Sequence, residues 1–307
     1  MALILNNLLP IFVVICLGIF LKHWGWLGDS FISSTDRLIY YIFFPCLLFW
    51  KISKPVDDFG IEPELVFGVF LTVFMIFSMS ILFCKLTGMA QYEIGSFSQG
   101  CYRFSSYIGL ALTFSAFGDA GGRTFGVLIG FVIPFINVLV VSSMIWYSGE
   151  SGSGISRMRL VVKAMISNPL ILACLGGILY SRMSVPLPTF IDNTLGLMSS
   201  LTLPLALVSI GGTLSFSGSR KFLAKSFQLS IIKLVAMPVL GYITLKQLEV
   251  TPLAIQVAMV YFALPTSPQN YILSSQLNSD VDLATSSILV TTTLSILSLS
   301  VVLIVFG

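Results

Sequence analysis

The chain has 307 residues, of which 56% are hydrophobic and only 9% are charged, with a formal net charge of +3 and a mean hydropathy of +0.97. Soluble domains have about 25% charged residues, so this composition excludes an ordinary soluble enzyme or binding domain. The few basic residues offer no charged surface to a polyanion, and no nucleic-acid partner is expected. The expected surroundings of the chain are the lipid bilayer.

The sequence contains apolar stretches that are long enough to cross about 30 Å of hydrocarbon, which takes about 20 helical residues. Because lipid offers no hydrogen-bond partners, these stretches must form helices that pair their own backbone groups. We therefore predict an all-α polytopic membrane protein. Its ten predicted spans are, in chain order, Leu3–Leu21, Ser33–Trp50, Leu65–Cys84, Ile94–Gly118, Thr124–Ser148, Leu160–Ser181, Asn193–Phe216, Phe222–Leu245, Pro252–Asn278 and Leu283–Phe306.

Basic residues are distributed unevenly over the connections between these spans. Nine lie near the odd-numbered connections and five near the even-numbered ones. Cytoplasmic connections of membrane proteins carry the excess of Lys and Arg. We therefore expect a multi-pass protein of the cell inner membrane with both termini on the non-cytoplasmic side, and the linker-like segment Ser148–Ser156 in the cytoplasm.

The two halves of the chain share landmarks at a nearly constant separation in sequence. Gly18 and Gly176 are 158 residues apart, Pro45 and Pro204 are 159 apart, and the segments around residues 104 and 264 are about 160 apart. Secondary transporters are often built from inverted repeats, and five helices per half would place the second half upside down. We predict a first five-helix repeat over 1–148, a cytoplasmic linker over 149–157 and a second, inverted repeat over 158–307. The alternative is that Gly and Pro are simply frequent in membrane helices.

Arg103 lies close to the middle of the fourth predicted span, in CYRFSSYIGLAL. A charge at that depth costs at least about 2.5–3.5 kcal/mol and usually faces a protein-lined or aqueous cavity. The planar guanidinium group forms paired hydrogen bonds that suit a carboxylate. The other interpretation is that the Arg103 side chain extends to the membrane interface.

The ninth predicted span contains two prolines, Pro265 and Pro268, in YFALPTSPQN. A proline inside a helix removes a backbone donor and costs about 3 kcal/mol. If the fourth and ninth spans are equivalent broken helices that cross near the midplane, the N-termini of their second halves direct N–H groups into one cavity and form an anion site. A simple packing kink is the alternative interpretation of the two prolines.

The remaining ionisable residues within the spans are few. Lys233 lies in the eighth predicted span, where it could screen or gate the anion path or extend along the bundle to an interface. No Asp or Glu lies in the middle of a predicted span, so a carboxylate proton relay within the membrane is not expected. The five cysteines show no CxxC spacing and predict neither a disulfide framework nor a metal site, and no cofactor is expected.

The sequence resembles the auxin efflux carrier family, in its bacterial branch of permeases. The resemblance extends over almost the whole chain, and four segments carry it: YRFSSYIGLALTFSAFG, SNPLILACLGGILY, LTLPLALVSIGGTL and ALPTSPQNYILSSQLNSD. It implies an architecture like that of the plant auxin carriers and bile acid symporters, with ten helices in two inverted repeats. Helices one, two, six and seven would form a scaffold, and the other six, including crossed and broken helices four and nine, a transport domain that moves as an elevator. The implied substrate is a small organic anion such as auxin, malonate or malate.

The resemblance also implies that the substrate binds where the two broken helices cross. Family members typically have Asn near the position of Ser105 and small residues near Gln269 and Asn270, so the ligand contacts of this chain are expected to differ. Pro45, Pro204 and Lys233 are expected to support the site. The predicted substrate-binding residues are Arg103, Phe104, Ser105, Ser106, Tyr107, Gly109, Pro265, Thr266, Ser267, Pro268, Gln269, Asn270 and Tyr271.

The predicted function is a secondary transporter that moves a mono- or dicarboxylate by alternating access. An enzyme is not expected, because no nucleophile–base pair or metal cluster lies in the spans. The sequence leaves open whether Na⁺ or H⁺ accompanies the anion and whether two copies pair as a homodimer. The alternatives are a Na⁺-coupled symporter of the same fold, an anion channel that does not saturate, and a ligand sensor that binds without flux.

Overall fold

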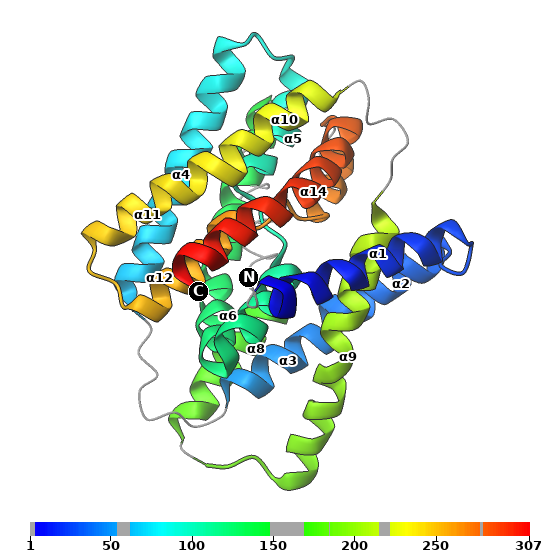
Figure 1. The fold of residues 1–307 in the computed structure, drawn as a ribbon, viewed down its shortest axis with the longest axis vertical. Coiled ribbons are helices and arrows are strands. Elements are labelled where there is room, and N and C mark those ends of the chain that lie inside the picture. Colours follow the sequence, from blue (N-terminus) through cyan, green and yellow to red (C-terminus); the bar gives the residue numbers. More distant parts are fainter. Residues whose placement is uncertain (1–3, 54–61, 148–168, 184, 215–221, 277–278) are drawn as a thin grey trace.

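The computed structural model describes residues 4–53, 62–147, 169–183, 185–214, 222–276 and 279–307, and all regular elements within these ranges are helical (Figure 1). The linker predicted over 149–157 lies outside the described residues. In chain order the elements are η1 (Ile4–Leu8), α1 (Leu9–His23), α2 (Asp29–Leu38), η2 (Ile39–Phe43), α3 (Phe44–Ile52), α4 (Pro63–Leu86), α5 (Gln91–Tyr102), α6 (Ser106–Tyr147), α8 (Pro169–Arg182), α9 (Thr189–Thr213), α10 (Leu223–Ile231), η4 (Ile232–Ala236), α11 (Met237–Gln247), α12 (Pro252–Ala263), α13 (Gln269–Gln276) and α14 (Val281–Phe306).

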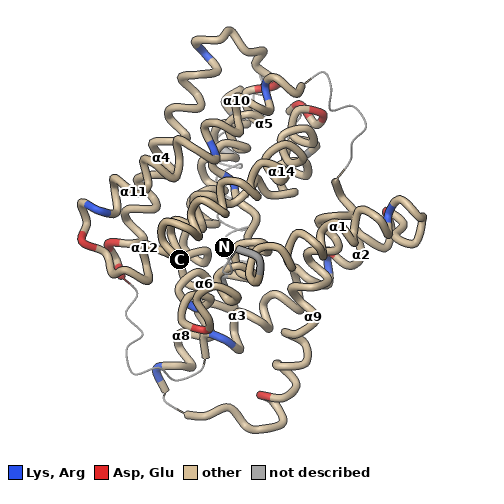
Figure 2. Tube along the Cα trace, in the orientation of Figure 1, with Lys and Arg blue, Asp and Glu red and all other residues tan. Residues whose placement is uncertain are grey.

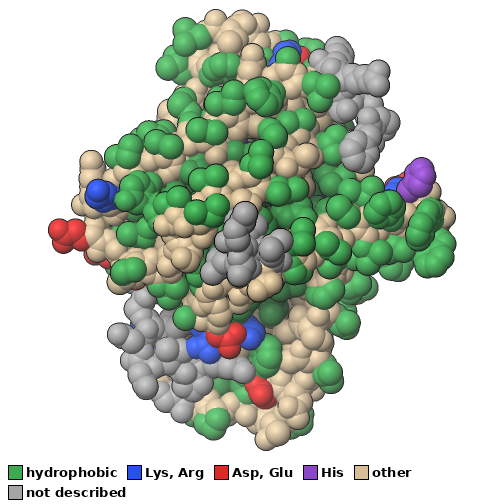
Figure 3. Space-filling view, viewed as in Figure 1, with side chains coloured by type: hydrophobic (Ala, Val, Ile, Leu, Met, Phe, Trp, Pro, Cys, Tyr) green, Lys and Arg blue, Asp and Glu red, His purple; other side chains and the backbone are tan. Residues whose placement is uncertain are grey.

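The lengths of these helices confirm the prediction of an all-α polytopic membrane protein. Six helical segments of the described chain are long and apolar enough to cross a membrane. One of them, Gln91–Met144, contains both the fourth and most of the fifth predicted span. The second and ninth predicted spans, and the described part of the sixth, fall on shorter helices. Figure 3 shows hydrophobic side chains over most of the visible face, as expected of a surface in contact with lipid. The number of membrane crossings stays a prediction.

A glycine separates the two helices that make up α6. Gly118 has φ 64° and ψ −159°, which no helical residue adopts. Glycine takes positive φ without the steric penalty that a Cβ atom would bring, so the chain kinks here at little cost. The kink coincides with the predicted end of the fourth span.

The described residues contain three π-helical turns, and each ends two residues before a proline. The turns are η1, η2 and η4, and the prolines are Pro10, Pro45 and Pro238. A proline ring clashes with the carbonyl group four residues earlier in an α-helix. A π turn inserts one residue and moves that carbonyl group aside, so the helix continues without a sharp kink.

The described helices pack in two groups. The first contains α1, α2, α3, α8 and α9, and the second contains α4, α5 and α10 to α14. The two groups meet through α6, which contacts both, and through η1, which contacts α14. The packing is consistent with the scaffold and transport domain that the family resemblance implies.

Two glycines allow α1 and α9 to approach closely within the first group. A Cβ atom on Gly211 would lie 2.0 Å from the carbonyl oxygen of Ile15, and one on Gly18 would lie 2.2 Å from the carbonyl oxygen of Val208. Helix interfaces in membranes gain their attraction from such close backbone packing, because lipid supplies no hydrophobic driving force. The glycine pair therefore fixes the contact between α1 and α9.

Charged residues lie mostly toward the ends of the helices. In Figure 2 the acidic segments lie at helix ends and connections, whereas the middle of the bundle is uncharged apart from a few basic segments. Two of the basic side chains, Arg103 and Lys233, are 5% and 0% exposed. Neither side chain extends to an interface in this structure.

Candidate anion site at two interrupted helices

Two helix interruptions meet inside the second group of helices. The first interruption, residues 103–105, separates α5 from α6, and the second interruption, residues 264–268, separates α12 from α13. The backbone N–H of Ser105 donates a hydrogen bond of 2.9 Å to the carbonyl oxygen of Pro265. The structure thus brings together the two segments that the sequence singled out.

The two interruptions begin with the same backbone conformation. Arg103, which caps α5, has φ −72° and ψ 147°, and Leu264, which caps α12, has φ −65° and ψ 147°. Leu264 precedes a proline, and a residue in that position is driven out of the helical region toward extended backbone. The two caps are 161 positions apart, close to the separation of the other repeat landmarks, which supports two equivalent broken helices.

Side chains from the second interruption anchor it to α5 and α14. Thr266 donates its hydroxyl proton to the carbonyl oxygen of Gly100 over 2.6 Å, and its backbone N–H donates to Oγ1 of Thr291 over 3.2 Å. Thr266 is 1% exposed, so both bonds are shielded from water. The backbone groups freed by the prolines therefore have partners, and Thr266 serves to hold the two interruptions in place.

The amide side chain of Asn270 binds back to α5. Its Nδ2 donates to the carbonyl oxygen of Ser96 over 3.3 Å, while Gln99 Nε2 donates to the carbonyl oxygen of Asn270 over 3.1 Å. Gln99 Nε2 also donates to Ser274 Oγ over 3.1 Å. Since all four residues are buried, this network joins the start of α13 to α5.

The guanidinium group of Arg103 binds three neutral amide oxygens. Nη1 donates to Gln99 Oε1 over 3.1 Å, and Nη2 donates to Asn137 Oδ1 over 2.7 Å and to Gln269 Oε1 over 3.0 Å. No carboxylate among the described residues pairs with Arg103. A buried cation without a counterion is costly, so these three amide oxygens are the groups that compensate the charge of Arg103 in this structure.

Unpaired donors lie beside Arg103. The hydroxyl group of Ser105 is buried and has no partner among the described residues. Ser106 and Tyr107, which begin α6, are half-buried, and the first N–H groups of a helix have no partner within it. The first turn of α6, which begins three residues after Arg103 in the chain, therefore offers uncompensated positive charge.

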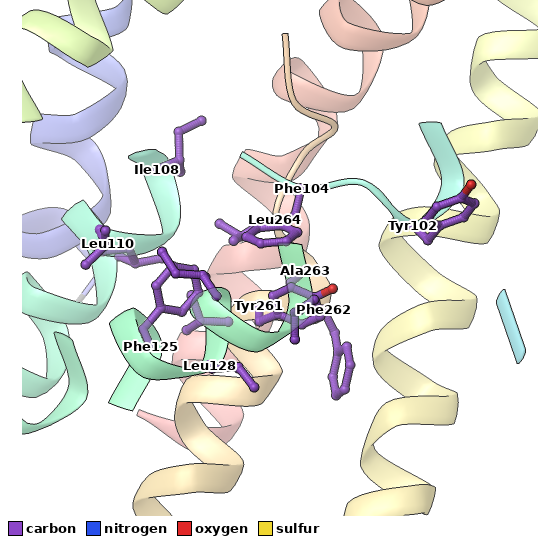
Figure 4. Close-up of a cluster of buried hydrophobic side chains, with 14 of the residues drawn as sticks. Tyr102, Phe104, Ile108, Leu110, Phe125, Leu128, Tyr261, Phe262, Ala263 and Leu264 are labelled. Atoms are coloured by element: carbon purple, nitrogen blue, oxygen red, sulfur yellow. The ribbon is translucent and has the colours of Figure 1, made fainter. Parts of the chain in front are cut away.

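Apolar residues close the other side of the interruptions. Figure 4 shows Phe104 beside Leu264 and Tyr261, and the rings of Phe104 and Tyr261 are 4.5 Å apart between centroids. A Cβ atom on Gly109 would lie 2.2 Å from Cζ of Phe125 and 2.7 Å from Cδ1 of Leu264, so a larger residue there would force these two side chains to move. This packing holds the interruptions in contact and leaves the polar side toward Arg103.

The other predicted site residues lie around this centre. Ser267 is buried and accepts from the backbone N–H of Gln269 over 3.3 Å. Pro268 is half-buried, whereas Gln269 and Tyr271 are exposed on the first turn of α13. On the first turn of α13, Gln269 is the residue whose side chain accepts a hydrogen bond from Arg103.

The three residues expected to support the site lie outside it. Pro45 is the second residue of α3 and Pro204 lies inside α9. Two residues before each proline, Thr202 Oγ1 of α9 donates a 3.1 Å hydrogen bond to the carbonyl oxygen of Phe43, the last residue of η2. Lys233 lies in η4 and contacts Tyr261, which packs against Phe104. The two prolines thus belong to the first group of helices, and Lys233 to the second.

Residues 3–303, nearly the whole chain, match the model of a protein family described as "Membrane transport protein". The chain belongs to the auxin efflux carrier family. Membership of this family identifies it as a multi-pass membrane transport protein rather than an enzyme.

Curated relatives of this family member are named as transporters. A protein of Methanothermobacter thermautotrophicus named "Uncharacterized transporter" is 27% identical over 299 residues, which cover 96% of this chain and 95% of the relative. A protein of Rhizobium meliloti named "Putative malonate transporter" is 25% identical over 305 residues, which cover 96% of this chain and 93% of the relative. A further "Uncharacterized transporter" of Methanocaldococcus jannaschii is 24% identical over 311 residues.

Sequence reasoning missed two partners of Arg103 in this family member. Asn137 comes from the second half of α6. It is the only amide side chain in an otherwise apolar stretch of that helix, and this isolation is a signal that could have identified it as a candidate site residue. Gln99 lies four residues before Arg103, a spacing that places two side chains on one face of a helix. Both signals are present in the sequence, but neither shows which cation the amide would meet.

Proposed function

We propose that this protein is a secondary carrier that moves a small organic anion across the cell inner membrane. One observation carries the proposal: the buried Arg103, at the contact of two helix interruptions, binds only neutral amide oxygens. A carrier must bind its anion without holding it permanently. In the empty state the amide oxygens of the site hydrogen-bond the Arg103 cation. The anion replaces these oxygens when it binds, and they replace the anion when it leaves, so the site can both bind and release its substrate.

The geometry favours a carboxylate as the group that is bound. Arg103 presents a planar fork, which pairs with the two oxygens of a carboxylate. Ser105 adds a free hydroxyl donor, and the first turn of α6 adds backbone N–H groups. Gln269 Oε1 and Asn137 Oδ1 are the acceptors that the carboxylate would replace.

A mono- or dicarboxylate of low mass is the proposed substrate class. The relative named as a malonate transporter supports this class, and auxin-like and malate-like anions belong to it as well. The proposed site is lined by the substrate-binding residues given above from both interruptions. Malonate is the first compound to test.

We also propose that ten helices form two inverted repeats, 1–148 and 158–307, and that transport follows an elevator motion. The equal backbone conformations of Arg103 and Leu264 support the repeat. The packing of the helices in two groups supports a first group that stays in place and a second that carries the anion. The first group is tightly packed at Gly18 and Gly211, as a fixed scaffold requires.

Uptake of radiolabelled malonate into proteoliposomes containing the purified protein tests the proposed function. We expect uptake that saturates with concentration and is accelerated by unlabelled malonate inside the vesicles. Flux that neither saturates nor responds to internal malonate would identify a channel. Binding without flux would identify a sensor, and flux that requires Na⁺ in place of K⁺ would identify a Na⁺ symporter.

A further inference from the structure

Lys233 is a fully buried basic residue that the anion site does not use. Its side chain is 0% exposed, within the second group of helices. The amine donates to Sδ of Met237 over 3.2 Å and lies 5.8 Å from the ring centroid of Tyr261. A thioether sulfur is a weak hydrogen-bond acceptor, and the face of an aromatic ring attracts a cation only modestly. Neither contact compensates for the hydration that an ammonium group loses on burial.

No anion faces this amine from any of the elements that pack against it. The helix α5 contributes Cys101, α12 contributes Tyr261 and α11 contributes Met237. From α4, α10 and α14 no charged or titratable side chain of the described residues interacts with Lys233. The carboxylate of Glu93 on α5 is paired with Lys225 on α10 by two hydrogen bonds of 2.6 and 2.7 Å, and neither residue interacts with Lys233. Lys233 is therefore a basic group without a counterion among the residues that the structure describes.

The backbone around Lys233 is irregular as well. Lys233 lies in the π turn η4, which ends two residues before Pro238. Such turns recur at functional sites, because the inserted residue redirects side chains and leaves backbone groups less tightly paired. The π turn places the amine toward α12 and α5, the two helices that end at the interruptions.

A short path of packed rings joins Lys233 to the anion site. The amine faces Tyr261, the ring of Tyr261 packs against Phe104 at 4.5 Å between centroids, and Phe104 follows Arg103 in the chain. Tyr261 and Phe104 lie together in Figure 4. An anion bound at Arg103 would therefore act on Lys233 across these two rings, in a medium that screens charge poorly.

We propose that Lys233 takes up a proton when the carrier binds its anion, so that one proton is transported with each anion. The proposal rests on the proposed function. In the step, the lone pair of Nζ forms an N–H bond with a proton from water on one side, and the bond breaks when the anion leaves on the other side. Nothing is oxidised or reduced.

The direction of coupling follows from electrostatics. Negative charge at the anion site stabilises the ammonium form of Lys233, and by linkage the ammonium form strengthens anion binding by the same factor. Lys233, Arg103 and both interruptions belong to the second group of helices, so proton and anion would move together. The result is symport of H⁺ with the anion and not exchange of one for the other.

Calorimetry on the purified full chain tests the coupling at equilibrium. Malonate is titrated in two buffers that differ in ionisation enthalpy, at a mildly alkaline pH at which malonate is fully ionised. We expect the wild type to take up one proton per malonate bound. Lys233→Arg, which carries its charge at every accessible pH, should bind malonate without taking up a proton. Lys246→Met is the matched control, because this exposed lysine also faces a tyrosine ring, that of Tyr242, and should leave proton uptake unchanged.

A second measurement does not depend on the substrate. In the ¹⁵N spectrum of protein labelled at the lysine side chains, without anion, we expect one neutral amine resonance that is lost in Lys233→Arg. A wild type that binds malonate without proton uptake, or a spectrum with ammonium resonances only, would overturn the proposal. If the wild type neither binds nor transports malonate but shows the neutral amine resonance, malonate is the wrong substrate. The claim that Lys233 is neutral in the empty protein would then still be supported.

Discussion

The backbone N–H of Ser105 donates to the carbonyl oxygen of Pro265 over 2.9 Å, and this single bond joins two helix interruptions that are 160 residues apart in sequence. In a membrane, backbone that leaves a helix must find its partners in the protein. Here each interruption supplies partners for the other. The pair can therefore persist at a depth where one broken helix alone would expose unpaired groups.

Restoring the second interruption to a helix should remove anion binding. In the variant Pro265→Ala with Pro268→Ala, both residues regain a backbone donor and the ring clashes disappear. We expect a thermal stability equal to or above that of the wild type and no further stabilisation by malonate, since the helix consumes the groups that hold the two interruptions together. Pro134→Ala is the control, because Pro134 lies inside the continuous second half of α6. A double variant that malonate still stabilises would mean that the prolines only bend the helix.

Asn137 should control how strongly Arg103 is held in the empty site. Its Oδ1 accepts a 2.7 Å hydrogen bond from Arg103, and bonds to a charged group contribute about 1.5–3 kcal/mol. Asn137→Asp gives the cation a built-in counterion that competes with the substrate, so malonate affinity should fall. Asn137→Ser, which keeps a neutral acceptor, should lower affinity much less. Equal affinities for the two variants, measured by calorimetry, would contradict the proposed competition.

The contact between α1 and α9 should not tolerate a methyl group. In Gly211→Ala the new Cβ atom would lie 2.0 Å from the carbonyl oxygen of Ile15, which is backbone and moves only with the helix. Overpacking typically costs about 1–3 kcal/mol, so the melting temperature should fall. In the matched variant Gly176→Ala the nearest atoms are 3.7 Å away, in the Phe49 ring, and the melting temperature should not change. A stable Gly211→Ala protein would show that these helices can separate.

The orientation in the membrane can be tested independently of the site. The excess of basic residues at the odd-numbered connections predicts that position 152 is cytoplasmic and position 185 is not. In a background without the five native cysteines, Val185→Cys should react with an impermeant maleimide in intact cells. Gly152→Cys should react only after permeabilisation. Reaction of Gly152→Cys in intact cells would invert the predicted orientation.

Features that depend on one residue's own chemistry could be predicted from the sequence. The prolines at 265 and 268, the charge of Arg103 in an apolar run and the glycine that ends the fourth predicted span all act locally, and the structure has interruptions or kinks at each of them. Asn137 could not be assigned to Arg103, because a polar residue does not specify a partner 34 positions away, and Gln99, although only four positions away, carries no mark of the cation that it meets. The π turns were missed as well, although each precedes a proline.

The half-buried Asp36 shows a related limit. Asp36 lies near the start of the second predicted span and accepts a hydrogen bond from Ser209 on α9. The sequence did not indicate that these two residues would meet. A partly buried carboxylate needs a hydrogen-bond donor, and here a neighbouring helix supplies it. That donor comes from the other half of the chain, so only the packing of α2 against α9 shows it.

The most direct test of the anion site is the equilibrium affinity of the purified protein for malonate, measured by calorimetry for the wild type, Arg103→Ala, Arg103→Lys and the exposed control Lys85→Ala. Removing one partner of a desolvated charge pair costs about 2–5 kcal/mol, so Arg103→Ala should bind at least about thirty-fold more weakly. Arg103→Lys should recover part of the affinity, because it keeps the charge and loses the fork, and Lys85→Ala should bind like the wild type. A folded Arg103→Ala protein that binds malonate as tightly as the wild type would contradict an anion site at the two interruptions.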